Sequence, residues 1–328
     1  MYKRQVYDTG EDNALRYGHA PVYCTTDTPP EDADVVPMAS MDVTSFSYAC
    51  RDTLAEISRL RGDGRESEWR EKADAVAANL KARLWDDKRH ACFDRDKHGK
   101  TIDVLCHNTL RCMYWGSISQ KMADAFVRQH LLNPQEFWTP LPLPSVAVND
   151  PLFRNAPENN WSGQCEGLTY QRAIIALERY GYEPLVTKLG RKLLDAIIRG
   201  GYVFTQQFDP FTGEPSRVGM VSHEVLSRDS DEPFQDSYGP TLLAAVEYIA
   251  HIWGIALVGD EVWFSLGSGL SYTYAQRFGD DVYEIKSDGR SGAIYKNRIA
   301  VGSAPCGVRL VTNRDGKILR TVKIEEGV

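Results

Sequence analysis

From residue 44 onward, apolar side chains recur every three or four positions, the spacing that gathers them on one face of an α-helix. The pattern predicts a helical hairpin over about 44–84, shorter helices near 106–116 and 119–132, and longer helices over about 167–181, 183–199 and 240–253. The residues that share a helix face are Leu54, Ile57 and Leu60; Ala73, Val76, Leu80 and Leu84; Leu185, Leu189, Leu193 and Ile197; and, expected to point inward, Leu242, Val246, Ile249 and Trp253. Helix pairs joined by long loops recur at roughly 40–60 residues, which is typical of an α/α toroid and equally of a helical solenoid.

Beyond Gly259 the pattern changes to short runs rich in β-branched and aromatic residues, separated by turns that contain glycine, aspartate or asparagine. We therefore expect a mainly α protein, with a partial α/α toroid over residues 1–257 and a small antiparallel β domain over 258–328. Structural support is the expected role of the β domain, and a sugar-binding face is the alternative.

Long loops punctuate the helical part. Residues 6–43 and 133–144 contain many prolines, and two polar, aromatic loops at 158–167 and 202–215 flank the helices between them. Long loops in a compact domain usually carry function. We therefore expect the chemistry of this protein to lie in its loops.

The bulk composition excludes several classes. The chain has 328 residues, 42 % of them hydrophobic and 25 % charged, which is typical of a globular protein. A net charge of −7 without a long basic run argues against nucleic acid and anionic membrane as partners. The longest apolar run, 249–258, is too short to span a membrane. Seven cysteines without CxxC spacing argue against a disulfide framework or a zinc site, so a reducing, cytoplasmic location is expected.

Two acidic positions are candidates for catalysis. Asp12 lies in an acidic loop, where an Asx turn is the simpler explanation from spacing alone. Glu166 follows Trp161 at a junction between a loop and a helix, where an aromatic ring could stack on a sugar and the helix N-terminus would favour a carboxylate. Helix capping is the competing explanation for Glu166.

The second polar loop offers Gln206 and Glu214, while Asp209 before a proline is expected to serve a turn. Histidines at HExxH spacing, a GxSxG elbow and a phosphate-binding glycine loop do not occur in the sequence. No metal or other cofactor is therefore expected.

These motifs, in this order, resemble the α/α-toroid sugar hydrolases of the trehalase and glycoside hydrolase family 63 type, including the mannosylglycerate-hydrolase-like branch. The segments that carry the resemblance are Thr9-Gly-Glu-Asp-Asn-Ala, Phe137-Trp-Thr-Pro, Asn160-Trp-Ser-Gly, Gly181-Tyr182 and Phe204-Thr-Gln-Gln-Phe-Asp-Pro-Phe-Thr-Gly-Glu. The resemblance implies that Asp12 is the general acid of a glycosidase and that a carbohydrate is the substrate.

Three positions depart from the family pattern: Ser162 replaces an arginine, Glu166 replaces a tryptophan, and Gln206 replaces the general base. An amide cannot accept the proton of an attacking water, so another carboxylate must serve, with Glu166 the first choice and Glu214 the second. The family also has about six helical hairpins, more than the pattern here supplies. This shortfall, and an opening Tyr2-Lys-Arg-Gln that resembles adapter read-through in a metagenomic gene, predict an N-terminally truncated fragment.

The resulting hypothesis is an inverting glycoside hydrolase acting on an oligosaccharide or small glycoside, with Asp12 as general acid and Glu166 as base. The residues expected to form its sugar pocket are Trp138, Trp161, Gln206, Gln207 and Glu214. Two alternatives stay open. Phosphate could replace the activated water, as in an inverting phosphorylase, or the chain could bind sugar without cleaving it.

Overall fold

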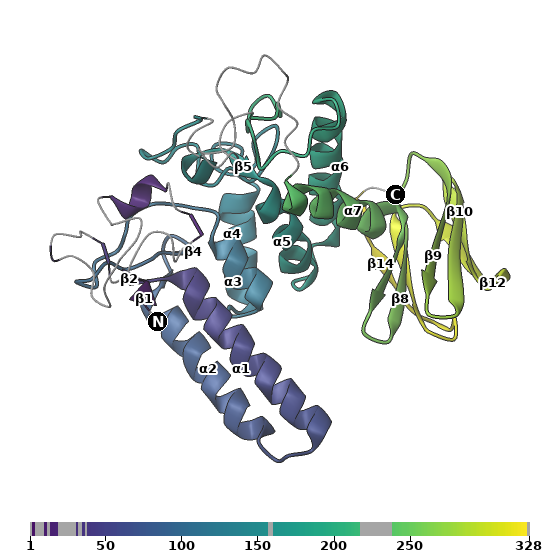
Figure 1. Ribbon diagram of the computed structural model, residues 1–328, viewed down its shortest axis with the longest axis horizontal. Helices are drawn as coiled ribbons and strands as arrows, with labels where there is room; N and C mark the ends of the chain where they lie inside the picture. Colours follow the sequence, from purple (N-terminus) through teal and green to yellow (C-terminus); the bar gives the residue numbers. More distant parts are fainter. Residues whose placement is uncertain are drawn as a thin grey trace, which may run out of the picture.

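The computed structural model describes residues 2–3, 10–11, 14–18, 31, 35–36, 38–156, 160–216 and 238–326 (Figure 1). Asp12, the expected general acid, lies outside these residues. The helical part begins with a long antiparallel hairpin of α1 (Met41–Arg61) and α2 (Glu66–Arg83), which Figure 1 shows projecting from the remaining helices. The helices that follow are α3 (Thr109–Trp115), α4 (Gln120–Phe126) with the π-helical turn η3 (Val127–Leu131), α5 (Gly167–Glu178), α6 (Glu183–Arg199) and α7 (Gly239–Trp253).

Each odd-numbered helix contacts the next odd-numbered helix along the chain: α1 contacts α3, α3 contacts α5, and α5 contacts α7. The hairpin partner α2 packs on α1, and α6 packs on both α5 and α7. The main hydrophobic core lies among these helices and the loops that join them. No described helix has the length and apolar character that a membrane crossing requires.

The apolar stripe predicted for α6 is confirmed, because Leu185, Leu189, Leu193 and Ile197 are all buried. The inward stripe predicted for α7 is wrong: Leu242, Val246 and Ile249 are exposed and Trp253 is half-buried. The buried face of α7 consists instead of Thr241, Ala244, Ala245, Tyr248 and Ile252.

Close helix packing explains this reversal. Small residues on the buried face let α7 approach its neighbours closely, and a Cβ added to Gly190 of α6 would lie 2.3 Å from the Tyr248 ring. Helix α1 behaves similarly, since Leu54, Ile57 and Leu60 are exposed while Ser45 and Ala55 are among its buried residues. Periodicity therefore located these helices but did not identify the face that packs against the core.

Three pairs of two-residue strands lie in the loops of the helical part. They are β1 (Tyr2–Lys3) with β2 (Met38–Ala39), β3 (Trp85–Asp86) with β4 (Ala91–Cys92), and β5 (Cys165–Glu166) with β6 (Gln207–Phe208), each pair antiparallel. Two 3₁₀ turns, η2 (Leu15–Tyr17) and η4 (Asn160–Ser162), lie beside each other. The pairing of β5 with β6 joins the two polar loops that the sequence singled out.

The C-terminal part consists of two four-stranded antiparallel sheets, in the orders β14-β13-β8-β7 and β12-β11-β10-β9. The strands are β7 (Ile255–Val258), β8 (Glu261–Leu266), β9 (Ser271–Phe278), β10 (Asp281–Asp288), β11 (Ser291–Lys296), β12 (Ile299–Pro305), β13 (Val308–Asn313) and β14 (Ile318–Lys323). A second hydrophobic core, with Phe264 and Ile285 among its members, lies between the sheets. The expected boundary between residues 257 and 258 falls inside β7.

A buried ion pair connects the helices to the first sheet. Arg309 on β13 donates to Glu178 on α5 at 2.7 Å, to Ser265 Oγ at 2.9 Å and to the His251 carbonyl at 3.1 Å. The His251 ring also hydrogen-bonds Glu178 at 2.8 Å, and the guanidinium of Arg309 lies 4.5 Å from the centre of the Trp263 ring. Charge and hydrogen bonding, in addition to apolar packing, thus hold the two parts together.

Candidate active site

Glu166 and Gln206 meet where β5 pairs with β6. Glu166 lies opposite Gln207 in the ladder, is fully buried, and immediately precedes α5. The Gln206 side-chain amide donates to Glu166 Oε1 at 3.0 Å, and the Gln206 carbonyl accepts from the Gly167 backbone N–H at 2.9 Å. The amide that replaces the expected base therefore orients a carboxylate.

Gly167 holds this junction against α7. A Cβ at this position would lie 1.7 Å from Thr241 Oγ1, and Thr241 in turn donates to the Thr205 carbonyl at 2.6 Å. No larger residue fits without moving α7 or the loop. The close approach therefore fixes the position of Glu166, one residue earlier.

The other acidic candidate in this loop is placed differently. Glu214 is exposed in a turn whose geometry Asp209 maintains by accepting from the backbone N–H groups of Phe211 at 2.7 Å and Thr212 at 3.0 Å. Although burial acts to raise the pKa of Asp209, hydrogen bonds from Asn155 and from this turn lower it overall. Asp209 thus stabilises the turn, as the sequence predicted. In the same loop, Gln207 is buried beside Glu166.

Trp161 is buried in η4, where it packs with Ala14, Tyr17 and Met38. Ser162, the residue that replaces a family arginine, accepts a hydrogen bond from the Leu15 backbone N–H at 2.9 Å. This contact anchors the segment after Asp12 beside Trp161. Two of the loops that carry predicted site residues are therefore adjacent.

Trp138 lies apart from these contacts. It is half-buried and packs against the main hydrophobic core. Within the described part of the chain, no hydrogen bond or ring contact connects it to Trp161 or Glu166. The structure thus brings Glu166, Gln206 and Gln207 together but does not join Trp138 or Glu214 to them.

A buried charge cluster centred on Glu11 was missed at the sequence level. Glu11 is 1 % exposed, forms ion pairs with Arg16 and, at 2.9 Å, with Arg111, and accepts from Asn108 at 3.0 Å. Burial acts to raise the pKa of Glu11, but the two guanidinium groups, aided by His107 and the Asn108 amide, lower it to about 2. The residue before the expected general acid is therefore an ionised, tightly held carboxylate.

His107 extends the cluster toward Glu166. Burial, together with the positive charges of Arg111 and Arg16, lowers the pKa of His107 to about 3, so its ring is neutral. Nδ1–H then donates to the Pro144 carbonyl at 3.4 Å, and Nε2 accepts from the Thr169 hydroxyl at 3.3 Å. Thr169 lies three residues after Glu166, on the first turn of α5, so the hydrogen bond to His107 connects the segment that carries Arg111 to the helix that follows Glu166.

The Trp161 ring contacts the same groups: the guanidinium carbon of Arg111 lies 5.6 Å from its centre, and the His107 ring centre lies 6.4 Å away. A guanidinium near an aromatic face is favourable by about 0.5–2 kcal/mol. No periodicity or motif in the sequence marks Arg111 or His107. Only the side-chain types, basic residues in an otherwise apolar stretch, could have indicated them.

Buried carboxylate, amide and aromatic groups at the loop ends of a helical array are features of a sugar-processing enzyme, and comparison with known proteins identifies the class as a six-hairpin glycosidase of the family 63 type. The model of the mannosylglycerate hydrolase MGH1-like glycoside hydrolase domain matches residues 3–229. The chain belongs to this family.

Solved structures agree at the level of the fold. The family 63 mannosylglycerate hydrolase from Thermus thermophilus in complex with Tris is 16 % identical over 76 % of this chain and 64 % of that chain, with a TM-score of 0.54. The neutral trehalase of Saccharomyces cerevisiae is 14 % identical over 66 % and 38 %, with a TM-score of 0.52. A sialidase is 13 % identical over 100 % of this chain and 29 % of its own, with a TM-score of 0.64.

The chain is shorter than these relatives. In complex with glucose, the Thermus enzyme is 19 % identical over 64 % of this chain and 47 % of that chain, with a TM-score of 0.49. The chain thus spans about half the length of that relative.

Proposed function

We propose that this chain carries the catalytic site of an inverting glycoside hydrolase, in which Glu166 is the general base and Asp12 the general acid. The observation that carries the proposal is the buried Glu166 carboxylate at the loop end of α5, with the Gln206 amide donating to its Oε1 at 3.0 Å. Membership of a glycoside hydrolase family supplies the reaction class.

Inversion needs one carboxylate to take a proton from water while a second carboxyl protonates the leaving oxygen, with the two about 6.5–9.5 Å apart. In the proposed mechanism, Glu166 removes the water proton and the water oxygen attacks the anomeric carbon. Asp12 protonates the oxygen of the bond that breaks. The hydrogen bond from Gln206 holds the base carboxylate in one orientation, which preorganises the step.

The neighbour of Asp12 that the structure describes is held firmly in place. Glu11 forms buried ion pairs with Arg111 and Arg16. A general acid must lie within hydrogen-bond reach of the oxygen that it protonates, and an anchored neighbouring residue restricts where Asp12 can lie.

For the substrate, we propose an oligosaccharide or small glycoside bound between the two polar loops. Gln206 and Gln207 would hydrogen-bond the sugar hydroxyls, Trp161 would contribute aromatic surface, and Trp138 and Glu214 would make outer contacts. We further propose that residues 1–257 form part of an α/α toroid, since α1, α3, α5 and α7 contact one another in sequence. Residues 258–328 would form the β domain.

The decisive experiment compares Glu166→Gln with Glu214→Gln in the full chain, using mannosylglycerate, trehalose and a set of nitrophenyl glycosides as substrates. Loss of a general base lowers kcat by about 10²–10⁴, so Glu166→Gln should show that loss and azide should partly restore turnover. Glu214→Gln, at an exposed position, should keep kcat within about twofold of the parent, and loss of an outer substrate contact should appear only in KM. NMR should detect the inverted anomer as the first product.

Other results would redirect the assignment. Full activity in Glu166→Gln would remove Glu166 from the mechanism. Turnover that needs phosphate and releases a sugar phosphate would identify a phosphorylase. Saturable sugar binding without any product would identify a binding protein. Unchanged turnover in Asp12→Asn would refute the proposed acid.

A further inference from the structure

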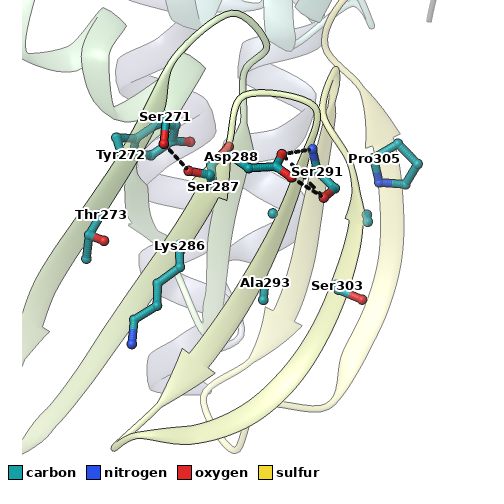
Figure 2. A pocket seen from close by; sticks show the side chains of 12 residues that line it. Ser271, Tyr272, Thr273, Lys286, Ser287, Asp288, Ser291, Ala293, Ser303 and Pro305 are labelled. Atoms are coloured by element: carbon teal, nitrogen blue, oxygen red, sulfur yellow. Dashed lines mark hydrogen bonds between the residues drawn. The ribbon is translucent and has the colours of Figure 1, made fainter.

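The outer face of the sheet β9–β12 contains a groove of about 790 Å³ (Figure 2). Along β9 the side chains alternate between exposed and half-buried, and the inward ones pack on the core between the sheets. The groove is formed by the outward positions of all four strands. The groove is broad and open, so a ligand would lie along the face of the sheet and not inside an enclosed cavity.

Hydroxyl-bearing side chains are the commonest polar groups in the groove lining. Ser271 and Thr273 on β9, Ser291 on β11 and Ser303 on β12 are all exposed and line it. Figure 2 shows Ser303 next to Ala293, its partner in the ladder, so the floor is low at this point. Hydroxyl groups both donate and accept hydrogen bonds, which suits a ligand that does the same.

Two charged side chains of opposite sign complete the lining. The Asp288 carboxylate accepts from the backbone N–H groups of Arg290 at 2.8 Å and Ser291 at 2.7 Å. Lys286 is 3.4 Å from Glu284 and has its ammonium group 5.0 Å from the centre of the Tyr295 ring. Lys286 therefore lies over the Tyr295 ring, which is not part of the groove lining, and the lining offers a ligand hydroxyl groups and two charged side chains.

This lining disfavours other classes of ligand. A stable protein interface needs large apolar or aromatic anchors at its centre, whereas small polar side chains occupy the centre of this groove. Nucleic acid requires an excess of positive charge, whereas one lysine and one aspartate give the lining no net charge. A neutral polyhydroxylated ligand fits a lining that has small polar side chains at its centre and no net charge.

We propose that the groove on the outer face of β9–β12 is a second carbohydrate site, which binds a neutral oligosaccharide and lies apart from the Glu166 site. In Figure 1 this sheet lies past α7, on the opposite side of the molecule from β1 and far from β5, the strand that carries Glu166. The inference rests on the proposed function only for the choice of sugar as the ligand class. Such a site would keep an oligosaccharide bound to the protein at a distance from the catalytic loops.

The test measures binding by calorimetry, with maltohexaose, cellohexaose and mannohexaose as probes on the full chain. At least one probe should bind saturably. Ser303→Trp should then weaken binding at least tenfold, because an indole at this edge-strand position would cover the floor above Ala293. The matched control is Thr321→Trp, which also replaces an exposed hydroxyl residue on an edge strand, β14, outside the groove. It should leave the affinity within twofold.

Two further variants separate the possible outcomes. Thr273→Trp blocks the groove from the opposite edge strand and should also weaken binding, which covers the case that Ser303→Trp fails to fold. Glu166→Gln should bind the probe as the parent does, even if it abolishes turnover. The inference is overturned if none of the three probes binds, or if both groove variants bind like the parent. Loss of binding in Glu166→Gln alone would assign the sugar to the catalytic loops, supporting the proposed function against the second site.

Discussion

Replacing Arg309 by methionine should strongly destabilise the junction between the helices and the β sheets. The side chains of Arg309 and Glu178 are 3 % and 9 % exposed, so the change leaves a buried carboxylate without its guanidinium. Breaking a buried ion pair by removing one partner costs about 3–5 kcal/mol. His251 still donates to Glu178 at 2.8 Å, so we expect a loss of about 3 kcal/mol, the lower end of that range.

The effect should depend on pH. Burial acts to raise the pKa of Glu178, but hydrogen bonds and charge from His251 and Arg309 lower it overall from 4.5. A lowered folded-state pKa gives stability that is complete above about pH 4.5 and is lost as the pH falls through the folded value. In Arg309→Met the carboxyl protonates more readily. The difference between variant and parent should therefore be largest near pH 7 and shrink toward pH 4.

Urea unfolding followed by circular dichroism, at pH 7 and at pH 4.5, measures the loss of unfolding free energy and its change with pH. The control is Arg320→Met, which breaks the ion pair with Glu261 at the surface, where the side chains are 47 % and 29 % exposed. Exposed pairs contribute about 0–1 kcal/mol. A loss below about 1 kcal/mol for Arg309→Met at pH 7, or an equal loss at both pH values, would refute this reasoning.

Three further changes test other parts of the structure. Gly167→Ala should cost about 1–3 kcal/mol in unfolding free energy through overpacking against Thr241, and Thr241→Ala in the same chain should recover part of it, both measured by urea unfolding. Val246→Ser on the exposed face of α7 should change stability by less than about 0.5 kcal/mol, whereas Leu189→Ala on α6 should cost about 2–5 kcal/mol. In Glu11→Gln, two buried guanidinium groups lose one of their counter-charges, while Arg111 keeps Asp42 at 3.3 Å and Arg16 keeps Asp94 at 4.0 Å. With a folded pKa of about 2, the Glu11 carboxylate stabilises the chain fully above about pH 4.5 and progressively less toward pH 2, so the cost of the change should shrink over that range in acid titrations of stability.

Each of these expectations has a clear counter-result. For Gly167→Ala the matched control is Gly239→Ala, where an added Cβ meets nothing within 4 Å, and equal costs at the two glycines would contradict the close approach. A Val246→Ser cost similar to that of Leu189→Ala would mean that the α7 stripe is covered. A cost of Glu11→Gln that does not vary with pH would show that the ion pairs contribute no stability.

The positions of the helices and the start of the β-rich part were predictable, because helical and strand periodicities depend on residues near one another in the chain. The stripe of α6 was also assigned to the correct face. For α7 the same rule failed, since the buried face is the one whose Tyr248 and Ile252 fit against Gly190 of α6. Hydrophobicity alone does not include that steric requirement.

The sequence by itself determined which residue types were available for catalysis, including Glu166 and the unexpected Gln206, and it supported the resemblance to family 63 enzymes. Only the tertiary structure decided that Glu166 and Gln206, 40 residues apart, share a hydrogen bond across β5 and β6. It alone also brought Arg111 to Glu11, 100 positions earlier in the chain. Contacts between such distant positions arise from the packing of whole elements, and no local pattern in the sequence records them.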